Sequence, residues 1–184
     1  IMDGNGRWAQ QKHLPRIMGH KQGAETVRAM VKACVELNIH YLSLYTFSTE
    51  NWKRPDKEVS FLMNLFKTLS KKEAPELIKQ GVRLVCLGHQ NDLTQDVRLA
   101  LDEVEQATAG GSHLQLNLMF NYGARQELVD ACLRVAKQYQ EGALSTITEA
   151  AISEALYTSD IPDPELLVRP GGEHRLSNFM LWQL

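Results

Sequence analysis

The sequence lacks the features that mark several large classes of protein. It has three cysteines in 184 residues, Cys34, Cys86 and Cys132, which stand among apolar neighbours and show no C-x-x-C spacing. We therefore expect reduced core thiols and a reducing, cytoplasmic compartment, because disulfide frameworks and zinc sites depend on paired cysteines. No apolar run approaches the roughly 20 residues of a membrane-spanning helix. Contact with a membrane is expected to be peripheral, at its inner face.

Several charge and catalytic signatures are also missing. The 20 Lys and Arg residues are balanced by 22 Asp and Glu residues, giving a net charge of −2 without the basic excess of a nucleic-acid-binding protein. The six histidines form no H-E-x-x-H motif, and neither G-x-S-x-G nor G-x-x-x-x-G-K-[ST] occurs. These absences argue against nucleic-acid partners, a zinc site, acyl transfer and P-loop chemistry.

What the chain does contain is an alternation of strand and helix patterns. Apolar residues at helical spacing predict helices over 23–38, 56–72 (with a further helix past Pro75), 93–110, 123–139 and 148–156. Short apolar runs predict strands at 39–47, 82–87, 114–120 and 166–168, and Ile1-Met2 is typical of the end of another. This order indicates an α/β fold with a mostly parallel central sheet covered by helices. We expect one domain over residues 1–184, cut at both ends.

Polar segments follow the predicted strands. They are Asp3 to Trp8, Ser48 to Arg54, Asn121 to Gly123 and Arg169 to Arg175. In parallel α/β sheets, ligands bind outside the carboxyl ends of the strands. The sequence therefore predicts that these segments gather at one edge of the sheet.

The opening segment Asp3-Gly4-Asn5-Gly6-Arg7 resembles an anion site. Glycines allow the backbone to turn and approach a ligand, and a helix start offers free N–H groups to a phosphate. Asp3 would then hold a hard cation against that phosphate, as magnesium is usually held. The alternative is a plain turn with a solvated carboxylate, and the residue types alone leave both open.

The other polar segments have a functional and a plain interpretation as well. Two arginines around Pro170-Gly171-Gly172 can converge on one phosphate, with Ser177 as a further donor, or they belong to a solvated surface loop. Arg16 and His20, four residues apart, share a helix face and form a second phosphate clamp, unless His20 is a structural hydrogen bonder. The Ser48 to Arg54 segment is either a loop that closes over a substrate or an exposed connector.

Taken together, the five segments 3–9, 19–20, 47–55, 121–123 and 169–179 resemble, in order and spacing, the motifs of the cis-prenyltransferases, and of the bacterial undecaprenyl diphosphate synthases above all. That resemblance implies an α/β fold distinct from P-loop and dinucleotide-binding folds. It also implies a magnesium-dependent transferase that adds isopentenyl diphosphate repeatedly to farnesyl diphosphate. The product would be a long-chain polyprenyl diphosphate such as undecaprenyl diphosphate, a lipid carrier of cell-wall precursors.

The resemblance also implies roles for individual residues. Asp3 would be catalytic and bind Mg²⁺, and Asn51 would accept the proton. The allylic diphosphate would contact Gly4, Asn5, Gly6, Arg7, Trp8, Arg16 and His20. The isopentenyl diphosphate would contact Arg169, Arg175, Leu176 and Ser177. The closing loop would supply Ser48, Thr49, Glu50, Trp52 and Arg54.

The growing product is expected in an apolar tunnel lined by the helix from Gly23 and the strands at Leu42 to Leu44 and Leu116 to Phe120, as in that family. Met119 and Phe120 replace usual small residues and Ala124 a usual glycine, which leaves product length open. The family's chain continues past Leu184 with a second magnesium-linked Glu and much of a homodimer surface. The alternatives are a non-catalytic partner subunit, which usually lacks the Asp and the Arg pair, and a phosphate-ester hydrolase.

Overall fold

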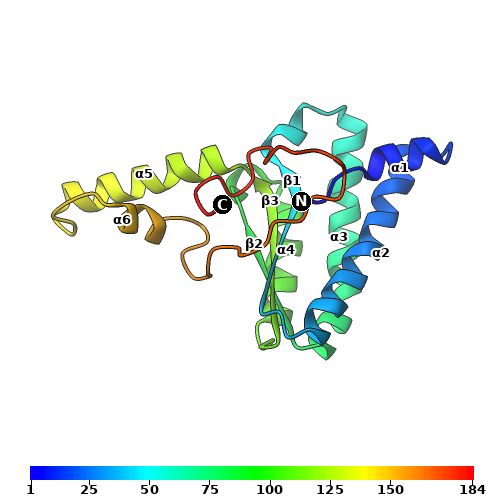
Figure 1. Cartoon of the computed structure of the whole chain (residues 1–184), viewed down its shortest axis with the longest axis horizontal. Coiled ribbons are helices and arrows are strands. Elements are labelled where there is room, and N and C mark those ends of the chain that lie inside the picture. The colour runs from blue at the N-terminus through cyan, green and yellow to red at the C-terminus, as the bar shows by residue number, and fades with distance from the viewer.

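The centre of the molecule is a parallel sheet of three strands. The computed structural model describes residues 1–184. Its strands are β1 (Tyr41–Ser48), β2 (Val82–Leu87) and β3 (Leu114–Tyr122), in the order β1-β3-β2 (Figure 1). All pairs are parallel, so each connection crosses over through helix, as the alternating pattern predicted. The predicted α/β class is confirmed.

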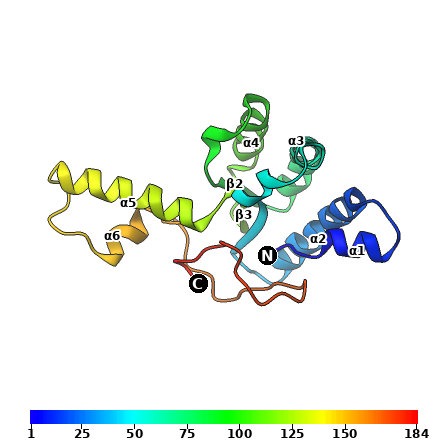
Figure 2. The ribbon, with the colours of Figure 1, turned by 90° about the horizontal axis from the view of Figure 1, so that it is seen from above.

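Helices α2, α3 and α4 cover one face of this sheet. They are α2 (Arg16–Glu36), α3 (Asp56–Lys79) and α4 (Gln95–Thr108), and all three lie on the same side when the molecule is seen from above (Figure 2). Alternate β3 residues Leu114, Leu116, Leu118 and Phe120 face them in the largest buried cluster. This core fixes the sheet against the three helices, of which α2 carries the predicted site residues Arg16 and His20 near its start.

The opposite face of the sheet is covered by the end of the chain. Tyr45 and Met119 pack there against Phe179 and Met180, and the loop through residues 169–178 crosses the same side (Figure 2). The remaining helices are α1 (Asn5–Gln11), the 3₁₀ helices η1 (Thr49–Lys53) and η2 (Gln90–Asp92), α5 (Ala124–Gln140) and α6 (Glu149–Glu154). No helix combines the length and the apolarity that crossing a bilayer requires.

Several predicted boundaries were wrong. α2 begins at Arg16, directly after Pro15, and not at Gly23; a proline is tolerated at a helix start because the N–H that it lacks would have no partner within the helix. α3 runs unbroken through Pro75, so the expected second helix is its last turn. The expected strands at 1–2 and 166–168 do not form, and the Ile1 nitrogen donates a single hydrogen bond to the Val168 carbonyl (2.6 Å). One hydrogen bond is not enough to pair two segments as strands. The chain then turns away at Gly4, whose φ is 83°.

The helix predicted at 123–139 is present as α5 (Ala124–Gln140), but the expected core position of its cysteine was wrong. Cys132 is exposed, whereas Cys34 and Cys86 are buried as expected. α5 projects away from the sheet and packs on α6 (Figure 1), so its buried residues are Ala124, Glu127, Ala131 and Val135.

Candidate active site

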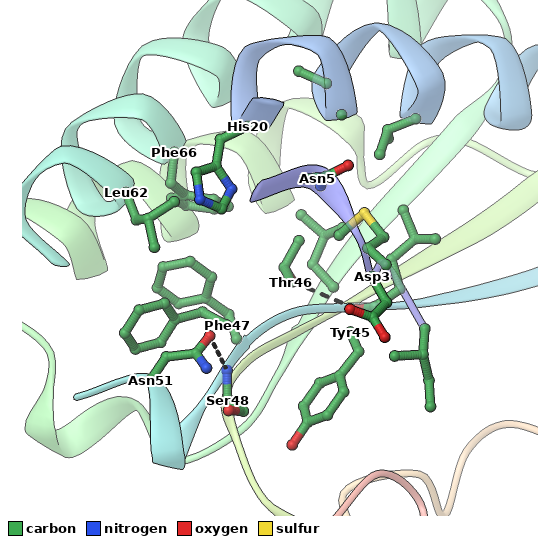
Figure 3. Close-up of a pocket in the computed structure, with 18 of the residues that line it drawn as sticks. Asp3, Asn5, His20, Tyr45, Thr46, Phe47, Ser48, Asn51, Leu62 and Phe66 are labelled. Atoms are coloured by element: carbon green, nitrogen blue, oxygen red, sulfur yellow. Dashed lines mark hydrogen bonds between the residues drawn. The ribbon is translucent and has the colours of Figure 1, made fainter. Parts of the chain in front are cut away.

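A single large cleft of about 1340 Å³ opens at the carboxyl edge of the sheet. Its mouth is formed by the opening loop, the end of β1 with η1, and the loop that carries Arg169 (Figure 3). The polar segments therefore meet at one edge, as predicted. The predicted site residues that line the cleft are Asp3, Gly4, Asn5, Gly6, Arg7, Arg16, His20, Ser48, Glu50, Asn51, Arg54, Arg169, Arg175, Leu176 and Ser177.

Three predicted site residues do not line the cleft. Trp8 lies on α1, where the Lys12 ammonium stands 4.6 Å from its ring centroid. Thr49 and Trp52 belong to η1 but take no part in the cleft wall. The structure therefore places these three outside the cleft lining.

Asp3 is held at the mouth by an arginine from the far end of the sequence. Arg169 donates to Asp3 Oδ2 from both Nε (3.1 Å) and Nη2 (2.9 Å). The Gly4 N–H donates to Oδ1 (2.7 Å), and Arg7 Nη2 lies 3.4 Å from the same oxygen. Burial opposes ionisation of Asp3, but the hydrogen bonds and charges of these neighbours outweigh it and hold its pKa below the ordinary value. Asp3 is therefore an ionised carboxylate in a cationic setting, and not a solvated turn residue.

The loop at residues 169–178 is ordered by the same guanidinium. Arg169 also donates to Ser177 Oγ (2.9 Å) and to the Arg175 carbonyl. Its guanidinium therefore makes four hydrogen bonds to three partner residues. Arg175 itself is mostly exposed and pairs with Glu173, which also accepts from Arg7 Nη1 (3.2 Å). Arg169 thus organises the mouth, while Arg175 lies exposed at its rim, paired with Glu173.

Close backbone packing of α1 against α2 places the second cationic group. A Cβ at Gly19 would lie 1.9 Å from the Asn5 carbonyl, so this contact requires glycine. It brings the Arg16 guanidinium within 3.2 Å of where a Cβ on Gly6 would stand, beside the start of α1. Arg16 and His20 do share one face of α2, as their spacing predicted.

His20 is a neutral ring with an unsatisfied nitrogen. Burial lowers its pKa, and the nearby charges of Arg54 and Arg16 lower it further, against the opposing effect of Glu58. The distance from His20 Nε2 to Glu58 Oε1 is 3.6 Å, too long for a hydrogen bond, so Nε2 is buried without a partner. Figure 3 shows the ring directed into the cleft beside Leu62 and Phe66 of α3. A ligand that supplied a polar atom here would satisfy it.

The η1 segment stands over the mouth and is held in place by side-chain hydrogen bonds. The Ser48 N–H donates to Asn51 Oδ1 (3.3 Å; dashed in Figure 3). Glu50 Oε1 accepts from Asn178 Nδ2 (2.7 Å), a residue of the Arg169 loop. The η1 segment and the loop at residues 169–178 are therefore in direct contact.

Below the mouth the cleft becomes apolar. The expected walls from α2 and the two strands are present, including Val27, Leu44 and Phe120, whereas Leu42 and Met119 lie outside the lining. The wall that the sequence analysis missed is α3, which contributes Leu62, Leu65, Phe66, Leu69 and Leu77. The apolar stripe of α3 was predicted, but a stripe does not reveal whether it packs on the sheet or borders a cavity.

Further polar residues line the cleft without having been predicted as site residues, and four of them make contacts that shape it. Arg125 and Asn178 lie at the mouth, where the Arg125 N–H donates to Asn178 Oδ1 (2.9 Å). Deeper in the cleft, Arg28 of α2 pairs with Glu73 of α3 through two hydrogen bonds (2.8 and 2.6 Å). An apolar stretch of cleft therefore lies between a cationic mouth and an ion pair.

Comparison with known proteins agrees with this geometry. The family described as "Putative undecaprenyl diphosphate synthase" matches residues 1–184. An isoprenyl transferase of Agrobacterium fabrum is 49% identical over 185 residues, covering all of this chain and 75% of that protein. A Micrococcus luteus protein named ditrans,polycis-undecaprenyl-diphosphate synthase ((2E,6E)-farnesyl-diphosphate specific) is 44% identical, with 100% and 74% covered.

Two solved structures are similar in fold. Lavandulyl diphosphate synthase from Lavandula x intermedia, in complex with dimethylallyl diphosphate, superposes with a TM-score of 0.95 at 28% identity, over 100% of this chain and 80% of that one. A probable undecaprenyl diphosphate synthase from Campylobacter jejuni gives 0.77 at 36% identity, over 88% and 76%. The full-length family match, the identities to isoprenyl transferases and the shared fold show that this chain belongs to the undecaprenyl diphosphate synthase family of cis-prenyl transferases.

Proposed function

We propose that this protein is a magnesium-dependent cis-prenyltransferase that condenses isopentenyl diphosphate repeatedly onto farnesyl diphosphate, giving a long-chain product such as undecaprenyl diphosphate. The observation that carries the proposal is one cleft with a cationic mouth and a long apolar interior. Its volume of about 1340 Å³ exceeds the roughly 300–1,000 Å³ of small-molecule pockets, as a growing polyprenyl chain requires.

The mouth offers two groups of anion ligands. Arg16, His20 and the N–H groups of the opening loop would hold the allylic diphosphate, which would also give His20 Nε2 its missing partner. Arg169, Arg175 and Ser177 would hold the isopentenyl diphosphate. Two substrates fixed with their reacting ends aligned react as one complex, and such alignment is worth effective molarities of roughly 10⁵ M or more.

Asp3 is suited to hold magnesium at this mouth. Magnesium is usually bound by one or two carboxylates together with phosphate oxygens and water, and Asp3 presents an ionised carboxylate where the diphosphates would meet. When bound, the ion would neutralise charge that accumulates on the departing diphosphate. Arg7 and Arg16 would stabilise the same charge from the protein side.

The remaining steps fall to the residues around the reacting carbons. As diphosphate leaves the allylic carbon, the isopentenyl double bond attacks that carbon, and the new cation then loses a proton to restore a double bond. Asn51, on η1 above the cleft, is our candidate for assisting proton removal, and Ser48, Glu50 and Arg54 would keep water out. The lengthened chain then moves between α2 and α3.

The test is incubation of the protein with radiolabelled isopentenyl diphosphate, farnesyl diphosphate and magnesium. Butanol-extractable polyprenyl diphosphate is expected, and its absence would reject the proposal. Thin-layer chromatography separates the alternatives, since a hydrolase releases phosphate without chain growth and a non-catalytic subunit gives neither. In the Asp3→Asn variant, turnover should fall far more than affinity for farnesyl diphosphate.

We further propose that the complete protein is a cytoplasmic homodimer whose apolar product brings it to the inner face of the membrane. Light scattering on the purified protein should give twice the chain mass, and flotation with anionic vesicles should recover more protein after turnover than before. A monomer, or flotation independent of product, would reject the corresponding part.

A further inference from the structure

The carboxyl end of β3 carries an irregularity that the proposed reaction does not use. Phe47 pairs with Phe120 and Ser48 with Tyr122, so Asn121 is an extra residue bulged out of the strand pair. Its φ of 49° lies in the left-handed region, which asparagine tolerates better than most residues. Bulges next to sites re-aim a side chain. The bulge turns the Asn121 side chain into the protein, where 1% of the residue is exposed.

Both ends of the buried Asn121 amide are satisfied by partners that fix its orientation. The Trp52 indole N–H donates to Asn121 Oδ1 (2.7 Å). Asn121 Nδ2 donates to the His89 carbonyl (2.6 Å), and the His89 N–H donates back to the Asn121 carbonyl (3.1 Å). An indole can only donate and a carbonyl can only accept, so the amide cannot be reversed. An aspartate would lose the donor and a leucine both bonds.

The segment that precedes η2 packs closely against the bulge at Asn121. A Cβ at Gly88 would stand 2.0 Å from the Phe120 carbonyl, so the chain between β2 and η2 presses directly on the bulge. His89, the next residue, is the one that holds the Asn121 amide. The sheet therefore presents a fixed acceptor to η1.

Trp52 is the residue of η1 that uses this acceptor. It does not line the cleft, but its ring packs edge-on against Phe47 at 5.2 Å between centroids. Glu50 and Asn51 of the same helix do line the cleft. Trp52 thus contacts the sheet through Asn121 and Phe47, while its neighbours Glu50 and Asn51 face the cleft.

We propose that Asn121 is a positioning residue that anchors η1 over the cleft mouth through the indole N–H of Trp52. The inference rests on the proposed function for its kinetic consequence, but the anchor itself does not require a substrate. Loss of the bond frees η1 and lowers the fraction of molecules with Asn51 and Glu50 in place. The expected fall in kcat/KM is about tenfold, the factor that one hydrogen bond of about 1.4 kcal/mol corresponds to.

The first experiment measures the anchor without substrate. The chain has three tryptophans, so Trp8→Phe combined with Trp182→Phe leaves Trp52 as the reporter. In this background Asn121→Gly, which suits the left-handed φ, should increase acrylamide quenching of Trp52. Asn38→Gly is the matched control, because Asn38 also has a left-handed φ (54°) but lies exposed after α2. Equal quenching in Asn121→Gly and its parent overturns the proposal.

The second experiment asks whether Asn121 acts through Trp52 in otherwise unchanged protein. Trp52→Phe removes the N–H and keeps an aromatic ring beside Phe47. If Asn121 acts through this bond, Asn121→Gly should lower kcat/KM about tenfold alone but less than threefold further in Trp52→Phe. A merely structural role would give the same factor in both backgrounds and overturns the proposal. Failure of the unmodified protein to make polyprenyl product would reject the proposed function, and the quenching result would still decide the anchor.

Discussion

Replacement of Arg169 by lysine tests the central feature of the cleft mouth. The guanidinium makes two hydrogen bonds to Asp3 and one each to Ser177 and the Arg175 carbonyl. A lysine has one nitrogen and cannot reach all three partners, so the two-bond contact with Asp3 is lost. Charge-assisted hydrogen bonds contribute about 1.5–3 kcal/mol each when buried. Asp3 is 24% exposed, so we count about 1 kcal/mol for each lost bond.

Two or three lost bonds then predict that Arg169→Lys reduces kcat/KM for isopentenyl diphosphate by about 30- to 150-fold. The assay is the initial rate of label incorporation at saturating farnesyl diphosphate with varied isopentenyl diphosphate, in variants of matched thermal stability. Arg98→Lys, an exposed position on α4, is the control and should behave as the unmodified protein. A fall of less than threefold in Arg169→Lys, with the fold retained, would refute the assignment of Arg169 as organiser of the mouth.

Three other predictions concern packing, buried polarity and pH. Gly19→Ala should lower the free energy of unfolding by about 1–3 kcal/mol and abolish turnover, because its Cβ would collide with the Asn5 carbonyl. Gly110→Ala is the control: a Cβ there would have no atom within 4 Å, so thermal unfolding should be unchanged. Glu127→Ala should cost about 3–5 kcal/mol in urea unfolding, since this fully buried side chain accepts from three neutral donors, each of which would lose its partner at a cost of about 1 kcal/mol or more. A cost below about 1 kcal/mol contradicts this. The pKa of Asp3 is lower in the folded state, so its stabilising contribution is complete above the ordinary value of 3.8 and is lost as pH falls through the folded pKa. Urea unfolding of Asp3→Asn should therefore differ from the unmodified protein by a constant amount from pH 7 down to about pH 4. The two should converge only as the pH falls further, through the folded pKa, and a difference that grows on acidification would contradict the assignment.

The sequence correctly predicted those elements whose apolar pattern fits only one type of secondary structure. Residues 82–87 form a short apolar run that is bounded by Gly81 and Gly88, and β2 occupies these residues. The strand expected at 166–168 has a similar composition, yet no partner strand lies beside it and Leu166 is 78% exposed. Composition indicates that a segment can pair but carries no information on whether an edge is available.

The site could be predicted as a gathering of segments but not as a set of contacts. The carboxyl-edge rule correctly brought together the loops that carry Asp3 and Arg169, which lie 166 residues apart. The rule could not show that Asp3 and Arg169 bind each other, because the sequence analysis assigned each of them to a substrate or metal contact. Trp52 was expected to contact the substrate. It contacts Asn121 instead, and this contact depends on a bulge that the residue pattern does not predict.

The distance along the chain between Asp3 and Arg169 has a consequence for synthesis of the protein. Translation at about 5–20 residues per second needs about 8–30 seconds to add the 166 residues that separate them. During that time the opening loop has its glycines and its carboxylate but not the guanidinium that orders them. The nascent chain can therefore build the sheet and its helices before Arg169 is available to bind Asp3, so the mouth of the cleft is the last part of the molecule to be completed.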